Sequence, residues 1–337
     1  MTITRSQIRS TFIAASVLAF TACDEVPLSY GDANSIIAAV AAEPWAEIQD
    51  DVYGALETTI TTVRAEKTFT VTYQEPGAAY WDNLRRFRQM LVVGSREDFW
   101  VQQVLDDARD PITQNGVHQV YDVWSRGQTI TLILLDQGWG RDDLRPYLPE
   151  VNALLDGQYR QYARNRMYMS GTDSALADTL SLRAGFSMML PDVYRWQTRD
   201  SVYLFRNDNP DPSELIRQIA VTWMTPAAGM LDQERVVAWR NEMAAEHYTE
   251  PQEVVLEGSA EQSFDENGNR TYELMAQWRN PPDRGWPAGG PLITRVVNCD
   301  AQDRTYLLDA WLYAPGKEKY EYMIQLETLL DTFACRT

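Results

Sequence analysis

The stretch YLLDAWLYAPGKEKYEYMIQLETLL, residues 306–330, holds the two elements that decide the fold of the C-terminal half. Its first nine residues are rich in apolar and aromatic side chains and predict a β-strand. Pro315-Gly316 then predicts a turn. Beyond the turn, four apolar residues fall on one face of a predicted helix: Met323, Leu326, Leu330 and Phe333. A strand followed by an amphipathic helix indicates a sheet with a helix packed on it.

The residues before this stretch predict the rest of the same sheet. A helix is expected from Leu231 to Tyr248, with Asp232 as its N-cap. Strand runs flanked by two helices favour an antiparallel sheet covered by helices, which is an α+β layer. Six apolar runs predict strands: FSMML (186–190), SVYLFR (201–206), ELIRQIAVTWM (214–224), EVVLEGSAEQ (253–262), RTYELMAQW (270–278) and LITRVVNC (292–299).

The N-terminal half alternates strands and helices instead. A short strand over 35–41 precedes a helix that opens at Glu43-Pro44, and the apolar spacing extends this helix through Ile60 and Val63. Strands follow at 69–73 and 89–94, then a helix near 98–108, a hairpin around Ser125-Arg126-Gly127 and a long helix over 144–162.

Residues 171–178 are small and polar, so we place a boundary there. The predicted fold is α+β, with antiparallel-rich sheets covered by helices, in two α/β subdomains at 35–175 and 176–337.

The first segment predicts export. Arg5 and Arg9 precede the apolar run FIAASVLAFTA, which is too short to span a membrane, and residues 1–22 therefore predict a signal peptide. Thr21, Ala22 and Cys23 resemble the lipobox of bacterial lipoprotein precursors. That resemblance implies cleavage before Cys23, a lipid thioether on its sulfur and an acyl chain such as palmitate on its new amino group. The alternative is an ordinary secretory signal. Polar residues 23–34 then suit a lipidated tether.

Composition limits the partners. The chain has 48 acidic and 30 basic side chains, and loss of Arg5 and Arg9 would leave 28 basic ones, for a net charge near −20. Such a field repels phosphate backbones, so we expect no nucleic-acid partner. It also disfavours broad contact with anionic headgroups, so the membrane contact is expected to be the N-terminal lipid.

Once Cys23 carries lipid, Cys299 and Cys335 remain. An exported, oxidising setting permits a disulfide between them. The alternative is two separate thiols, and the sequence leaves both open.

The last 50 or so residues resemble a known family. WPAGGPLITR (286–295) and the later segment from Asp309 to Leu330 are similar to the C-terminal pattern of bacterial cell-envelope lipoproteins catalogued as a domain of unknown function. In that family a Gly-Gly-Pro strand start precedes a Tyr-Ala-Pro-Gly-Lys turn. The resemblance implies an exported lipoprotein with no assigned activity. The element order of the second half also resembles the PsbP/Mog1-like fold. The matching residues are Gly289, Gly290, Pro291, Tyr313, Ala314, Pro315, Gly316 and Lys317.

No catalytic, cofactor or metal motif is found in the sequence. His118 and His247 are far apart and have no ligand spacing around them, so both are expected to be structural. The acidic turn at 265–276 lacks the glycine and the final glutamate of a calcium loop. There is also no nucleophile elbow and no phosphate-binding loop. We therefore predict no catalytic residues, no cofactor and no metal.

The loop GWPAGGP, residues 285–291, is the candidate partner or ligand surface. Trp286 is predicted to be exposed, and Gly289 and Gly290 would let a ligand approach bare backbone. The structural alternative is a wide turn leading into a strand. The other tryptophans could form a stacking platform for sugars, but composition favours packing in the core. They are Trp81, Trp100, Trp124, Trp139, Trp278 and Trp311.

Two functions of different class follow. The first is a non-catalytic lipoprotein, anchored to a bacterial cell-envelope membrane, whose surface binds an envelope protein or glycan. The alternative is an envelope hydrolase that acts on glycans through paired carboxylates. A cleft with facing carboxylates and perturbed pKa values would favour the hydrolase, whereas an exposed apolar surface would favour the binding module.

Overall fold

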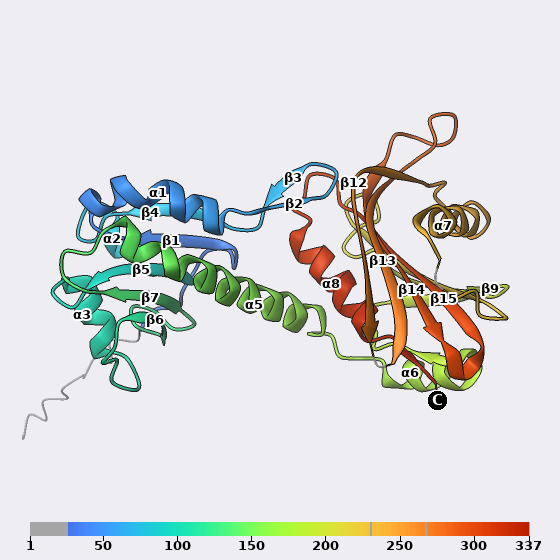
Figure 1. The fold of residues 1–337 in the computed structure, drawn as a ribbon, viewed down its shortest axis with the longest axis horizontal. Coiled ribbons are helices and arrows are strands. Elements are labelled where there is room, and N and C mark those ends of the chain that lie inside the picture. The colour runs from blue at the N-terminus through green and yellow to red at the C-terminus, as the bar shows by residue number, and fades with distance from the viewer. Residues whose placement is uncertain (1–25, 230, 267, 337) are drawn as a thin grey trace, which may run out of the picture.

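The computed structural model describes residues 26–229, 231–266 and 268–336. Its strands form two large sheets, each with helices on both faces, and two small two-stranded sheets (Figure 1). The predicted signal peptide and Cys23 lie outside the described residues. None of the helices in the described ranges is long and apolar enough to cross a bilayer. The α+β prediction is confirmed.

The first sheet has the strand order β4-β1-β5-β7-β6. Its first four strands are parallel and β6 is antiparallel to β7, as expected where strands and helices alternate. Helices α1, α4 and α5 cover one face and α2 and α3 the other. The strands are β1 (Ser35–Ala39), β4 (Thr70–Gln74), β5 (Gln89–Ser95), β6 (Gly116–Tyr121) and β7 (Thr129–Leu135). The helices are α1 (Ala42–Leu56), α2 (Trp81–Leu84), α3 (Phe99–Asp106), α4 (Arg141–Leu144) and α5 (Leu148–Met167).

The second sheet has the order β12-β13-β14-β15-β11-β10-β9 and is antiparallel throughout. Helix α7 (Gln233–His247) packs on one face, and the Asp232 carboxylate caps it by accepting a hydrogen bond from the backbone N–H of Arg235, as predicted. Helices α6 (Ser174–Ala184) and α8 (Tyr320–Asp331) pack on the other face. The strands are β9 (Arg195–Arg199), β10 (Val202–Asn207), β11 (Ile216–Met224), β12 (Glu253–Glu266), β13 (Asn269–Arg279), β14 (Gly289–Cys299) and β15 (Arg304–Tyr313).

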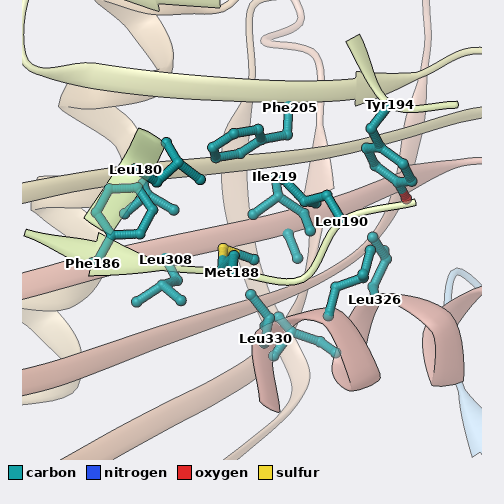
Figure 2. Packing of buried hydrophobic residues seen from close by; sticks show 14 of the residues in the cluster. Leu180, Phe186, Met188, Leu190, Tyr194, Phe205, Ile219, Leu308, Leu326 and Leu330 are labelled. Carbon is teal, nitrogen blue, oxygen red and sulfur yellow. The ribbon is translucent and has the colours of Figure 1, made fainter. Parts of the chain in front are cut away.

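Alternation along the strands gives the second sheet two cores. Figure 2 shows the core on the α8 side, where Leu326 and Leu330 meet Ile219 and Leu308. On the other face, Leu307 and Trp311 pack below α7. The α7 core also holds a buried ion pair, because Arg240 Nε lies 3.1 Å from Asp309 Oδ2 and both side chains are fully buried. Tyr248 and Thr294 donate to the same carboxylate, at 2.6 and 2.7 Å.

Several predicted boundaries were wrong. Helix α1 ends at Leu56, and Ile60 lies in β2 (Thr59–Thr61), which pairs with β3 (Ala65–Lys67). FSMML forms only the two-residue strand β8 (Phe186–Ser187), which pairs with β16 (Ala334–Cys335). Strand β9 was missed because all five of its side chains are exposed, as befits the edge of a sheet. Helix α6 was missed because the sequence there looked like a linker.

Helix α8 is shared by both halves of the molecule. Tyr320 and Ile324 join the core between the first sheet and α5, whereas Leu326, Leu329 and Leu330 join the core of the second sheet. Polar contacts flank it: Lys319 Nζ lies 2.7 Å from Glu66 Oε1, and Arg160 Nη1 lies 2.7 Å from Glu327 Oε2. Because the helix packs on both sides, it fixes the position of the second sheet against α5.

Candidate functional site

The predicted surface loop borders a pocket of aromatic side chains at the ends of β13 and β15. This aromatic pocket has a volume of about 240 Å³. Its ring walls are Trp278, Trp286, Trp311 and Tyr313, and its polar lining includes Arg206, Ser213, Glu250 and Asn280. The residues come from β10, β13, β15 and three loops, so only the folded sheet brings them together.

Trp286 is the outer wall of the aromatic pocket. Its side chain is 61% exposed, as predicted, and its ring meets Tyr313 edge to face at 5.6 Å between centroids. The Asn280 Nδ2 group donates to the Trp286 carbonyl at 2.6 Å, which ties the loop to the end of β13. The loop therefore presents an indole face to solvent from a fixed backbone.

Trp278 and Trp311 form the floor. They are 2% and 0% exposed and lie 5.3 Å apart in an edge-to-face arrangement. Trp278 Nε1 donates to the Leu312 carbonyl at 3.1 Å. Burial also raises the pKa of Tyr313, so this ring stays a neutral hydrogen-bonding phenol at physiological pH.

Gly290 explains why the glycine pair is needed here. A Cβ at this position would lie 1.8 Å from the Leu312 carbonyl oxygen and 2.9 Å from Trp278 Nε1. A Cβ on Gly289 would lie 2.8 Å from the Trp278 carbonyl oxygen. Gly290 is buried, so the prediction that it offers bare backbone to a ligand was wrong. Its role is to make room for the indole that forms the pocket floor.

Charged and polar groups form the opposite wall. Arg206 Nη2 lies 3.2 Å from Glu250 Oε1, and both side chains remain about one quarter exposed. The buried Oδ1 of Asn280 has no hydrogen-bond partner among the described residues. Aromatic faces next to polar donors and acceptors are the groups that small-ligand sites use for contact and orientation.

The remaining tryptophans do not form a platform with Trp286. Trp81 and Trp100 are buried beside the first sheet, and Trp124 packs edge to face on Trp81 at 5.3 Å. Packing therefore accounts for these three tryptophans, as composition favoured.

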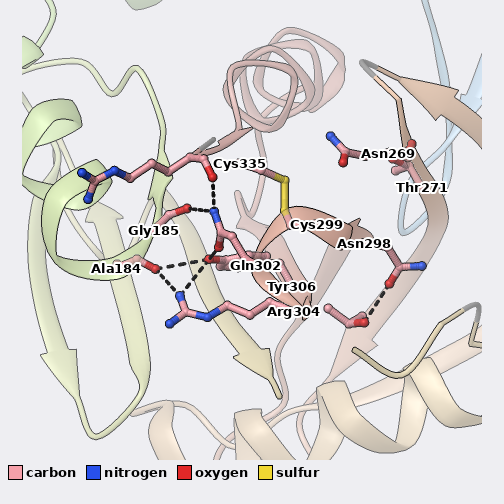
Figure 3. The surroundings of a disulfide bond; sticks show 12 residues. Ala184, Gly185, Asn269, Thr271, Asn298, Cys299, Gln302, Arg304, Tyr306 and Cys335 are labelled. Atoms are coloured by element: carbon pink, nitrogen blue, oxygen red, sulfur yellow. Dashed lines mark hydrogen bonds between the residues drawn. A yellow bond between two sulfur atoms is a disulfide. The ribbon is translucent and has the colours of Figure 1, made fainter. Parts of the chain in front are cut away.

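Cys299 and Cys335 form a disulfide between the end of β14 and β16 (Figure 3). The Gln302 amide beside it donates to the carbonyls of Gly185 and Arg336, both at 2.6 Å. Together these contacts hold the C-terminal segment against β8. Of the two alternatives that the sequence left open, the structure has the disulfide.

The predicted tether is attached to the first sheet along its described part. Arg126 N donates to the Pro27 carbonyl at 2.8 Å, and Ser29 N donates to the Arg126 carbonyl at 2.9 Å. Tyr30 then pairs with the segment before β5 and packs on Phe87. Main-chain hydrogen bonds therefore hold the predicted tether to the folded part of the chain from Pro27 onward.

A polar cleft of about 290 Å³ holds the carboxylates that bear on the hydrolase alternative. Asp32, Glu318 and Glu321 line it together with Tyr159 and Arg166. Burial raises the pKa of Glu321, and the Arg166 guanidinium 3.2 Å away opposes that shift. One carboxylate with a raised pKa is present, which is half of what paired-carboxylate chemistry needs.

Sequence reasoning missed one group of candidate metal ligands. Single ligand atoms of Asp200, Glu246 and His247 lie within 4.8 Å of one another. Both carboxylates are exposed, and His247 Nε2 is 3.7 Å from Glu246. Asp200 is 46 residues before Glu246, so no local spacing could have revealed the group.

The aromatic pocket lies within the part of the chain that matches a known protein-family model. The model of a family described as a domain of unknown function, DUF4837, matches residues 173–332. This match confirms the resemblance predicted from the glycine pair and the turn after Tyr313, and it covers the second sheet with α6, α7 and α8. No curated protein matches the chain.

Two solved structures are distantly similar. The solution structure of PsbP from Synechocystis sp. PCC 6803 is 10% identical, with a TM-score of 0.32 over 45% of this chain and 86% of that one. The Saccharomyces cerevisiae Ran-binding protein Mog1p is 10% identical, with a TM-score of 0.30 over 45% of this chain and 90% of that one. They are the two proteins for which the fold in the predicted resemblance is named.

Proposed function

We propose that this protein is an exported lipoprotein, held by a lipid on Cys23 to a membrane of the bacterial cell envelope, which binds a glycan in the aromatic pocket. The observation that carries the binding role is the exposed Trp286 indole beside the Arg206–Glu250 pair and Asn280. A sugar ring has apolar C–H faces and hydroxyl edges, so it matches a site with aromatic walls and polar rims.

The short N-terminal segment would hold the folded part of the protein close to the membrane. Four peptide steps separate Cys23 from Pro27, so the lipidated residue can lie at most about 15 Å from the point where the chain joins the first sheet. Strands β13 and β14, whose loop carries Trp286, lie at the other end of the long axis from the first described residues (Figure 1). The pocket would then face away from the anchoring membrane.

The binding role is tested by titrating short soluble oligosaccharides of glucose and N-acetylglucosamine and following tryptophan fluorescence and heat. We expect Trp286→Ala to weaken binding by roughly two- to tenfold, since an aromatic contact contributes about 0.5–1.5 kcal/mol. Trp196→Ala is the matched control, because Trp196 is 41% exposed on β9 and does not line the pocket. Equal losses in both variants, or no binding by any oligosaccharide, would contradict the proposal.

The anchor is tested separately. Cys23→Ala should yield a protein that stays in the soluble fraction and lacks the mass of the lipid, because the substitution removes the sulfur to which the lipid would be attached. Membrane fractionation and intact mass measure this result. An unchanged mass and an unchanged membrane fraction would overturn lipidation and leave the pocket assignment standing.

The hydrolase is the second candidate, on the evidence of Glu321 in the polar cleft. If Glu321 acts as a general acid, Glu321→Gln should abolish release of reducing sugar from glycan substrates. Absence of hydrolysis by the unaltered chain on the oligosaccharides that it binds would leave the binding module alone.

A further inference from the structure

A further cavity lies beside α8, on the face of the second sheet that this helix covers in part. Helix α8 packs on β11, β14 and β15, and the neighbouring stretch of β12 and β13 on the same face lines the cavity beside it. The gap encloses about 350 Å³ between β12–β14, α8 and strand β2 of the first half. We call it the α8 cavity. Its volume is at the small end of the range of about 300–1,000 Å³ typical of ligand sites.

The body of the α8 cavity is apolar. Ile60, Met275, Ile293, Met323 and Ile324 contribute side chains from both halves of the chain. Met275 remains 39% exposed although it faces the same side of the sheet as the buried Ile293 beside it. A ligand that covers exposed apolar surface of this kind lowers the free energy of the system by removing that surface from water.

One end of the α8 cavity is polar and has a surplus of negative charge. Arg160 and Glu327 line it. Arg160 Nη1 lies 2.7 Å from Glu327 Oε2, and Arg160 Nε lies 2.8 Å from Asp156 Oδ2. Tyr320 also donates to Asp156. One guanidinium therefore binds two carboxylates, and of these Glu327 lines the cavity, where its oxygens can accept a further hydrogen bond.

We infer that the α8 cavity binds an amphiphile with a single alkyl chain and a head group that donates hydrogen bonds, such as a primary amine. The alkyl chain contacts Met275, Ile293 and Met323, and the head group lies at Glu327. An anionic head group is disfavoured, because Glu327 lines the cavity and the carboxylates of Asp156 and Glu327 outnumber the Arg160 guanidinium between them. This site is independent of the aromatic pocket and of the lipid on Cys23.

The test is calorimetric titration of the full chain at pH 7 with octylamine, decylamine and decanoate, each below its micelle concentration. Each added methylene should tighten binding about fourfold, from its transfer free energy. Decylamine, which has two more methylenes, should therefore bind at least tenfold tighter than octylamine. Because its head group is cationic, it should also bind at least tenfold tighter than decanoate. Absence of saturable binding, or equal affinity for decanoate and decylamine, would overturn the inference.

Two variants separate this cavity from the general attraction of amines to an acidic protein. Met275→Trp fills the cavity and Met275→Gln makes its wall polar at nearly constant size, and each should weaken decylamine at least tenfold. Leu256→Trp is the matched control, because Leu256 is similarly exposed on β12 but does not line the cavity. Decylamine binding that survives both Met275 substitutions would place the ligand elsewhere.

Discussion

The substitution Gly290→Ala tests whether the glycine pair exists to hold the floor of the aromatic pocket. The new methyl group would lie 1.8 Å from the Leu312 carbonyl oxygen, where ordinary contact begins near 3.4 Å. Neither neighbour is a flexible side-chain end, because one is backbone and the other is the buried Trp278 indole. The strand at Leu312 must therefore move by more than 1 Å, and the Trp278 indole must shift as well.

The cost has two parts. Forcing a methyl group into a packed core costs about 1–3 kcal/mol. Displacement of Trp278 also breaks the 3.1 Å hydrogen bond from its Nε1 to the Leu312 carbonyl, which is worth about 1 kcal/mol. We expect a loss of about 2–4 kcal/mol in the free energy of unfolding. For a unit of about 160 residues, this corresponds to a fall in Tm of about 4–16 °C.

Urea unfolding and differential scanning calorimetry measure the loss, and the oligosaccharide titration shows whether the pocket is affected. Gly54→Ala and Gly157→Ala are the controls, because both positions are exposed in helices and no atom lies within 4 Å of the added Cβ. These two should be stabilised by up to about 1 kcal/mol. A Tm for Gly290→Ala within 1 °C of the parent would refute the steric argument.

Two further predictions concern buried polar groups of the second sheet. Asp309→Leu leaves the fully buried Arg240 without its counter-ion and should lower the free energy of unfolding in urea by about 3–5 kcal/mol. The double variant Arg240→Met/Asp309→Leu should recover most of that loss. A double variant that is no more stable than Asp309→Leu would contradict the expected role of the ion pair. Burial raises the pKa of Tyr194 to about 12, so its contribution to stability is complete below pH 10 and is lost as the pH rises toward 12. Tyr194→Phe should therefore gain about 1.3 kcal/mol relative to the parent between pH 9 and pH 11, and an unchanged difference in unfolding free energy would contradict that sign.

The second sheet could be predicted because its strands have continuous apolar runs and its helices have clear boundary residues. Asp232 marked the start of α7, and Pro315-Gly316 marked the end of β15. Helix α6 also had a usable signal, since Leu176 and Leu180 are four apart between the cap Asp173 and the left-handed Gly185. The small polar residues around them looked like a linker, and that composition outweighed the spacing.

The aromatic pocket could be predicted only in part. Trp286 was recognisable as an exposed residue, because its loop is rich in proline and glycine. Its neighbours are set by strand pairing, which places Trp278 opposite Gly290 and brings Tyr313 beside them. Such pairings join residues separated by 12 to 35 positions, and no local pattern records them.

The contacts that join the two halves show most clearly what local pattern leaves out. Glu66 and Lys319 are 253 positions apart in the sequence. Nevertheless, Lys319 Nζ lies 2.7 Å from the Glu66 carboxylate, and both side chains are buried. In the sequence each looks like a solvated surface charge, because charged residues are seldom buried without a partner. Helix α8 is equally ambiguous, since its apolar residues form one broad stripe although Tyr320 and Leu330 belong to different cores. The α8 cavity is lined by residues of both halves, from Ile60 to Glu327, and the way in which two units pack together is not encoded in the periodicity of either one.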